Sequence, residues 1–125
     1  MPTQFVVEFQ PPLDLPASLE PFRRHGDDLI DRWDGVRLMR TSTIADGRRI
    51  AWRAEPRGDT ARPALGVTVV EPLTPDGVAA LSAAIRGAFV VAPAGWPDLL
   101  ATDPIVAGLD ARYPGLRPYL QPDLF

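Results

Sequence analysis

The last 24 residues, 102–125, contain four prolines, at positions 104, 114, 118 and 122. Proline has no backbone N–H and fixes φ, so a segment this rich in proline cannot pair as a central strand or continue a helix. The segment nevertheless carries five large apolar side chains, which need a dry environment: Leu116, Tyr119, Leu120, Leu124 and Phe125. No element follows Phe125 to provide one, so we predict that these five residues form an interface with another domain or a partner. The alternative is that the tail folds back on its own domain.

Upstream of this tail, short runs of alternating apolar and polar residues predict half-buried strands over 4–10, 36–44, 49–55 and 65–69. The residues Ala45-Asp46-Gly47 join the second and third runs, and Asp-Gly between two such runs is a strong hairpin signal. Along this hairpin the alternation predicts that one face carries the apolar residues Val36, Leu38, Ile44, Ile50, Trp52 and Ala54. The segment 25–34 is acidic and is predicted to be a loop.

Helix signals occur at both ends of the alternating region. Asp14 is a candidate N-cap for a helix that Pro21 should end early, and Thr74-Pro75 begins the clearest helix, with an apolar stripe at Val78, Leu81, Ile85 and Phe89. Pro97 and Pro104 mark two short helices, and the second is predicted to be capped by Asp103 and to bury Ile105 and Leu109.

The predicted order of elements is β-α-β-β-β-α followed by short C-terminal helices. Strands that follow one another and are joined by hairpins form an antiparallel sheet. The sequence therefore predicts an α+β fold, with a small antiparallel sheet of about four strands and helices packed on one face.

Few residues suit catalysis or metal binding. The chain has no cysteine, which excludes disulfides and thiolate chemistry. Its one histidine, His25, precedes an acidic run whose spacing does not match a calcium loop, and no serine lies in a G-x-S-x-G elbow. No phosphate-binding glycine loop is present. We predict no catalytic residue, no cofactor and no metal. No apolar run is long enough to span a membrane and no signal peptide is evident, so we expect a cytoplasmic protein.

The basic residues are distributed unevenly. All 13 are arginine, and the net charge of −3 argues against a protein that binds nucleic acid over its whole surface. Residues 37–62 nevertheless hold seven arginines against three acids. Arg37, Arg49 and Arg53 fall on the polar parity of the hairpin and are candidate contacts with double-stranded DNA. The alternative is that they only keep the outer face of the sheet solvated.

The run DPIVAGLDARYPGLRP at 103–118, followed by QPDLF at 121–125, resembles the junction segment of bacterial DNA-3-methyladenine glycosylase II. Residues 5–9 and 12–15 resemble the N-terminal domain of that family more loosely. The resemblance implies an α+β N-terminal domain at 1–101, and at 102–125 a junction helix with a proline-rich tail leading toward a catalytic helix-hairpin-helix domain.

In this family the helix-hairpin-helix half carries the essential aspartate, and no position of this chain matches its motif. The resemblance therefore implies a non-catalytic module, inactive alone, that supports excision of alkylated bases in base-excision repair. Its partner would be a helix-hairpin-helix domain on the same or a separate chain. A free-standing α+β module that binds a protein or a small ligand, with no repair role, is the alternative.

Overall fold

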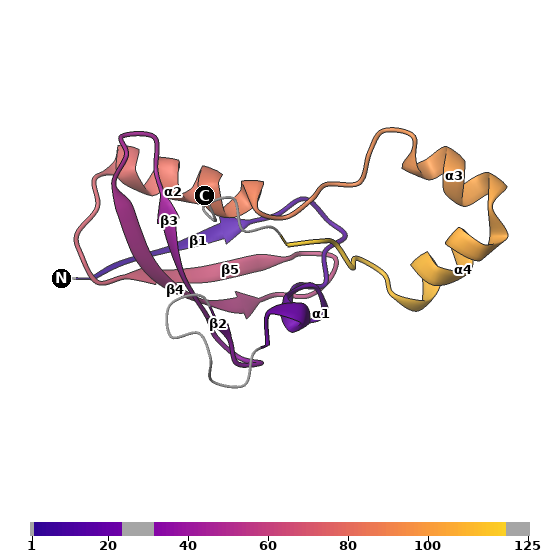
Figure 1. The fold of residues 1–125 in the computed structure, drawn as a ribbon, viewed down its shortest axis with the longest axis horizontal. Coiled ribbons are helices and arrows are strands. Elements are labelled where there is room, and N and C mark those ends of the chain that lie inside the picture. Colours follow the sequence, from indigo (N-terminus) through magenta and orange to yellow (C-terminus); the bar gives the residue numbers. More distant parts are fainter. Residues whose placement is uncertain (1, 24–31, 120–125) are drawn as a thin grey trace.

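The computed structural model describes residues 2–23 and 32–119. Over these residues the chain forms one antiparallel sheet with the strand order β1-β5-β4-β3-β2 (Figure 1). The strands are β1 (Thr3–Glu8), β2 (Arg32–Trp33), β3 (Leu38–Thr43), β4 (Arg49–Arg57) and β5 (Ala64–Val69). The helices are α1 (Leu15–Leu19), the 3₁₀ turn η1 (Glu20–Phe22), α2 (Pro75–Gly87), α3 (Trp96–Thr102) and α4 (Pro104–Arg112). The α+β class predicted from the sequence is confirmed.

The sheet has five described strands where the sequence predicted about four. The additional strand is β2, which pairs with β3 through Arg32 opposite Met39 and Trp33 opposite Leu38. A strand of two residues is too short to produce an alternating pattern, so the sequence assigned it to the acidic loop. Trp33 is fully buried, and its indole Nε1 donates a hydrogen bond to Oε2 of Glu20 at 3.1 Å.

The hairpin between β3 and β4 lies where Asp46-Gly47 predicted it. Gly47 adopts φ +87°, a left-handed conformation that favours glycine. The Asp46 carboxylate accepts a hydrogen bond from the backbone N–H of Arg48 at 2.9 Å, and the N–H of Ile44 donates to the carbonyl of Arg48 at 2.9 Å. Local turn chemistry therefore sets the register of β3 against β4.

The core lies between one face of this sheet and the helices α1 and α2. The strand register aligns one apolar residue from each strand in a continuous inward row, Phe5, Val67, Ala54, Leu38 and Trp33. Helix α2 covers this face with Leu81 and Ile85, and it begins where Thr74 Oγ1 accepts the N–H of Gly77 at 3.1 Å. The caps predicted at Asp14 and Thr74 are confirmed, because Asp14 Oδ1 also accepts the N–H of Ala17.

One residue of the hairpin departs from the predicted parity, and one arginine lies on the inward side. Val36 precedes β3 and is 63% exposed, whereas the sequence placed it on the apolar face. Arg40 lies two residues after Leu38 and so points to the same inward face, where it is only 4% exposed. Its guanidinium carbon lies 4.9 Å from the centre of the Tyr119 ring, a cation–π arrangement.

The described part of the tail returns to this core after α4. The backbone N–H of Asp14 donates to the carbonyl of Gly115 at 2.8 Å, and the N–H of Arg117 donates to Ser18 Oγ at 3.0 Å. Gly115 is buried and has φ +77°. A Cβ atom there would lie 2.8 Å from the backbone nitrogen of Asp14, so the tail can approach α1 this closely only at a glycine.

We predict that Gly115→Ala destabilises the chain much more than Gly47→Ala. Both glycines have positive φ, so both substitutions incur the left-handed cost of about 1–2 kcal/mol. Only Gly115 would also clash with backbone atoms, since no atom lies within 4 Å of a Cβ built on Gly47. Chemical denaturation should show a loss of unfolding free energy at least about 1 kcal/mol larger for Gly115→Ala. Equal losses would contradict the close packing of the tail.

Candidate functional site

The most distinctive feature of the fold is a helical arm, which we define as residues 91–114. The arm leaves and rejoins the body at one place, because the N–H of Val90 donates to the carbonyl of Pro118 at 2.9 Å. Next to this bond, Phe89 and Tyr119 form an isolated antiparallel bridge. Helices α3 and α4 lie between these two anchor points and extend to the right of the sheet in Figure 1.

The local sequence explains both helices of the arm. Each begins with proline at one of its first two positions, where the missing N–H costs nothing. Asp103 separates them, and its Oδ1 accepts the backbone N–H of Ile105 at 2.9 Å and of Val106 at 3.2 Å. Both helix starts and the Asp103 cap were predicted. The predicted boundary after residue 101 falls within the last turn of α3.

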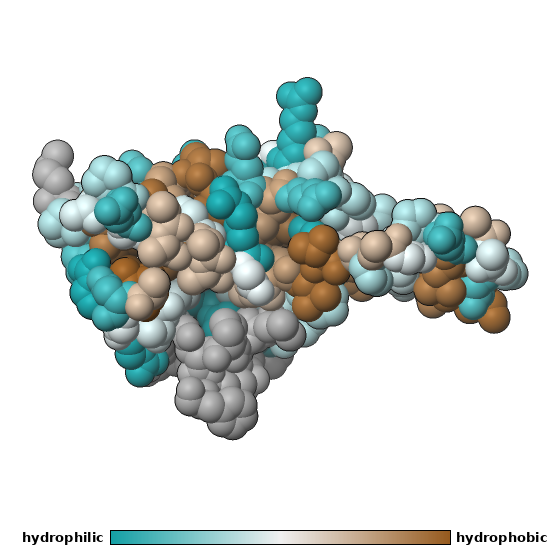
Figure 2. All heavy atoms as spheres, turned by 90° about the horizontal axis from the view of Figure 1, so that it is seen from above, coloured by the Kyte–Doolittle hydropathy of each residue, from teal (hydrophilic) through white to brown (hydrophobic). Residues whose placement is uncertain are grey.

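Nothing in the arm is buried. Every residue from 91 to 114 is at least partly exposed, including the apolar residues Val91, Leu99, Ile105, Leu109 and Tyr113. Ile105 is 74% exposed and Leu109 54%, so the predicted burial of these two side chains is wrong for this chain. Figure 2 shows hydrophobic residues at the surface of the arm, which again extends to the right.

An arm of this kind gains little stability from its own residues. Helix α3 has seven residues and α4 has nine, whereas isolated helices shorter than about 12–15 residues are marginal in water. In the described part of the chain these helices pack substantially only on each other. Ile105 and Leu109 are four residues apart, so they lie on one face of α4. The arrangement therefore suits a surface that another apolar surface covers.

The five residues predicted to form an interface do not share one environment in the structure. Tyr119 is buried in this chain's own core, with its ring 4.6 Å from that of Phe89, so it is not available to a second domain. Leu116 is half exposed beside the arm. Leu120, Leu124 and Phe125 lie outside the described residues. The sequence missed Ile105 and Leu109 as interface residues because periodicity identifies an apolar face but not what covers it.

A cleft of about 280 Å³ lies at the base of the arm. Its walls are mostly apolar, formed by prolines, Val90, Val91, Trp96 and Leu116, and two charged residues, Asp110 and Arg117, also line it. Burial lowers the pKa of the Arg117 guanidinium, and within the described residues its Nε has no hydrogen-bond partner. The cleft places one partly buried cation beside the exposed apolar surface of the arm.

The three predicted DNA contacts do lie on the face of the sheet opposite the core. Arg49 and Arg53 are exposed residues of β4 that alternate with the buried Ile50, Trp52 and Ala54. Arg37 precedes β3 and forms an exposed ion pair in which its Nε lies 3.0 Å from Oε1 of Glu55. The parity predicted for these arginines is therefore confirmed, and Arg37 is partly neutralised.

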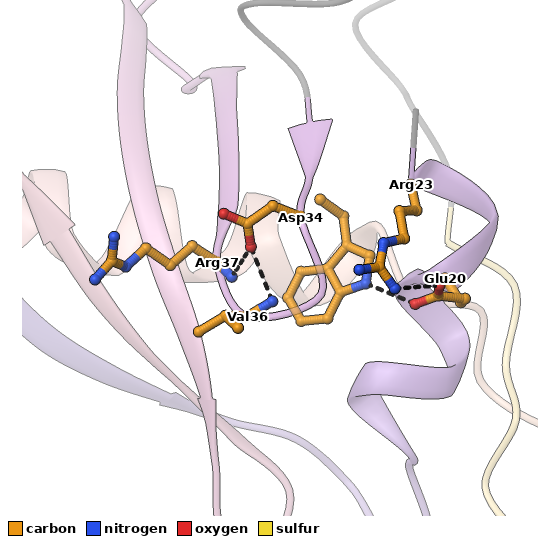
Figure 3. Close-up of polar contacts among 6 residues, drawn as sticks. Glu20, Arg23, Asp34, Val36 and Arg37 are labelled. Atoms are coloured by element: carbon orange, nitrogen blue, oxygen red, sulfur yellow. Dashed lines mark hydrogen bonds and ion pairs between the residues drawn. The ribbon is translucent and has the colours of Figure 1, made fainter. Parts of the chain in front are cut away.

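Two carboxylates near the short strand β2 have lowered pKa values, and both serve structural roles. Hydrogen bonds from Arg23 and then from the Trp33 indole hold the pKa of Glu20 below its usual range (Figure 3). Backbone N–H groups of Arg37 and Val36 donate to Asp34 Oδ1 and lower the pKa of that carboxyl group. These bonds fix β2 against η1 and β3, and they place no nucleophile beside a base.

Neither a metal centre nor a membrane helix is found over residues 2–23 and 32–119. No group of three or more His, Asp or Glu side chains in these ranges could hold a metal ion. None of the helices in the same ranges combines the length and the apolar character that crossing a bilayer requires.

Comparison of the chain with models of known protein families, with curated protein sequences and with solved structures finds no match. The site is therefore described by its geometry alone: an exposed apolar arm, the cleft at its base and an arginine-bearing sheet face.

We predict that truncating two isoleucines, one on α4 and one on α2, changes the stability by very different amounts. Ile105→Ala on α4 should change the free energy of unfolding by less than about 0.5 kcal/mol, because the side chain is exposed. Ile85→Ala on α2, where the side chain is 1% exposed, should cost about 2–5 kcal/mol. Urea denaturation of the two variants measures this difference. A similar loss at both positions would mean that the arm packs against the body.

We also predict that the chain loses stability in acid partly through Glu20 and Asp34. A carboxyl group whose pKa is lower in the folded state stabilises the fold above its unfolded pKa, about 4.5 for Glu and 3.8 for Asp. That stability is lost as the pH falls through the lower folded pKa. The melting temperature should therefore drop between about pH 6 and pH 3, and Glu20→Gln/Asp34→Asn should reduce the drop.

The matched control is Glu8→Gln/Glu71→Gln, which removes two charges elsewhere on the surface. It should leave the acid-induced drop in melting temperature close to that of the unmodified chain. If both double variants have the same pH dependence, the hydrogen bonds to Glu20 and Asp34 do not stabilise the fold.

Proposed function

We propose that this chain is a non-catalytic module that supports excision of alkylated bases in base-excision DNA repair, in the manner of the N-terminal domain of DNA-3-methyladenine glycosylase II. On this proposal it acts in the cytoplasm and has no glycosylase activity of its own. Its partner is a helix-hairpin-helix catalytic domain, on the same or a separate chain. The module would support the catalytic domain mechanically and leave the chemistry to it.

The observation that carries the proposal is the arm. Residues 91–114 contain no buried side chain, yet Ile105 and Leu109 present an apolar face on a helix of nine residues. A partner domain that covers this face would supply the burial that the short helices lack. The residues that resemble the glycosylase junction, 103–118, include all of α4 and the tail that returns to the body.

Hydrogen bonds of the tail to the body fix the position of the base of the arm. Hydrogen bonds from Asp14 N–H to Gly115 and from Val90 N–H to Pro118 fix the point at which the chain leaves the arm. Half-exposed Leu116 and the cleft lined by Val91 and Trp96 continue the apolar surface of the arm onto the body. A domain that covers the arm would therefore contact a surface whose position relative to the sheet is set.

Alternatively, the chain is a free-standing module that binds a protein or a small ligand. The cleft at the base of the arm favours this reading, because it is mostly apolar and contains Arg117 and Asp110. Its volume of about 280 Å³ is at the lower limit for small-molecule sites, which are typically about 300–1,000 Å³. Ile105 and Leu109 do not line this cleft, so a small ligand bound there would leave the exposed face of α4 unexplained, whereas a bound protein could cover it.

We predict that the chain forms a stable complex with a helix-hairpin-helix domain of this glycosylase family, measured by sedimentation velocity. Ile105→Asp/Leu109→Asp should weaken the complex at least about tenfold, because it would place two charges in a covered apolar face. Val70→Asp is the matched control, since Val70 is 88% exposed and lies beyond the end of β5, away from the arm.

Activity provides the second readout of this proposal. The purified chain should release no base from alkylated DNA, alone or with the Asp substitutions. Base release that is abolished by changing an acid of this chain would overturn the proposal, as would a complex equally tight for wild type and Ile105→Asp/Leu109→Asp. Stable monomeric behaviour with binding of an apolar ligand in the cleft would favour the alternative.

A further inference from the structure

The outer face of the sheet carries a line of cations along its central strand. Arg49, Arg53 and Arg57 occur at every fourth residue of β4, and all three are exposed. Because side chains alternate along a strand, residues four apart point to the same face. With a rise of about 3.4 Å per residue, their α-carbons lie about 14 Å apart, and the line is about 27 Å long. We call these three residues the β4 arginine row.

Over the residues that the structure describes, no neighbouring side chain neutralises the charge of the row. Among the described residues, Arg49, Arg53 and Arg57 form no ion pair. Glu55 is the one acid on β4, and it is paired with Arg37 at 3.0 Å. Arg32 lies on the edge strand β2, opposite the exposed Met39 of β3, and adds another cation to this face. The chain as a whole has a net charge of −3, so positive charge is concentrated on this face.

Small residues flank the row and leave it accessible. Residues opposite or between the arginines include Ala51, Ala64 and Gly66, which rise little above the backbone. Arg57 lies against Gly66 so closely that a Cβ at that glycine would be 2.4 Å from the guanidine Nε. No helix of the described chain covers this face, since α1 and α2 pack on the core side. A long, rigid partner could therefore lie along β4.

From this geometry we propose that the β4 arginine row binds the phosphate backbone of double-stranded DNA. Arginines at a regular spacing along one strand suit a linear polyanion of regular charge, and arginine is a preferred partner of phosphate. Outward-facing positions of β1, β3, β4 and β5 carry no aromatic ring, so single strands would lack stacking platforms. Contacts with phosphate oxygens carry no sequence information, so on this proposal binding is independent of base sequence. The choice of DNA over RNA rests on the proposed function.

The number of cations fixes the expected salt dependence. Neutralising three phosphates of a duplex gives a slope of about −2.7 in a plot of log K against log salt concentration. Dissociation constants of about 10⁻⁴ to 10⁻⁶ M at moderate salt are typical of such non-specific contacts. Contacts of this strength would assist a catalytic partner without holding the module on DNA alone.

The test is fluorescence anisotropy of a labelled 20-base-pair DNA duplex titrated with the full 125-residue chain from 25 to 200 mM salt. Arg49→Gln/Arg53→Gln/Arg57→Gln should weaken binding at least about tenfold at the lowest salt and reduce the slope by two units or more. The matched control is Arg48→Gln/Arg62→Gln/Arg112→Gln, which removes the same charge from exposed positions off the row. It should keep the affinity within about threefold of wild type. Circular dichroism confirms that both variants are folded.

Several results would overturn the assignment. The first is that the wild-type chain shows no binding to duplex DNA at 25 mM salt. The second is that the control variant loses as much affinity as the row variant, because net charge alone would then explain binding. Tighter binding of single-stranded DNA, or of poly-glutamate at equal charge, would assign the row to another anion. If duplex RNA binds as tightly as duplex DNA, the row contacts a phosphate backbone but does not select DNA. A chain that binds duplex DNA but no helix-hairpin-helix domain would leave this inference standing and defeat the proposed function.

Discussion

The return of the tail to the body is the contact on which the rest of this structure depends. Gly115 packs with positive φ against the backbone of Leu13 and Asp14, and two residues later the N–H of Arg117 donates to Ser18. Together with the bond from Val90 to Pro118, these contacts bring both ends of the arm to one point on the core. The arm can therefore project without disturbing the sheet, and its exposed face has a defined direction. A side chain at residue 115 would push the tail away from α1 and release that direction.

The fold divides its surface into regions that meet different physical requirements. The inward face of the sheet buries apolar residues from every strand, and α1 and α2 complete that core. The outward face carries arginine, threonine and small residues, and the described helices leave it uncovered. The arm presents leucine, isoleucine and tyrosine without burying any of them. The arm and the arginine face are separate surfaces of this chain, so the two proposed contacts use different residues.

Sequence patterns predicted those parts of the fold that are determined locally. Asp46-Gly47 fixed the hairpin, Asp14, Thr74 and Asp103 capped helices where expected, and parity placed Arg49 and Arg53 outward. The misses depend on contacts that a pattern does not encode. Strand β2 has two residues and exists because Trp33 is buried and bonded to Glu20. The apolar spacing of Ile105 and Leu109 predicted a face correctly but not that this chain leaves the face uncovered.

Hydrogen–deuterium exchange of the arm tests most directly the central claim that α3 and α4 need a covering surface. In the chain alone, amides of 96–112 should exchange far faster than those of β4 and β5, because short helices without buried side chains open at little cost. Adding a helix-hairpin-helix domain should slow exchange in 96–112 and leave β4 and β5 unchanged. Protection of the arm in the isolated chain equal to that of the core strands would contradict the account, because the arm would then be stable without any partner.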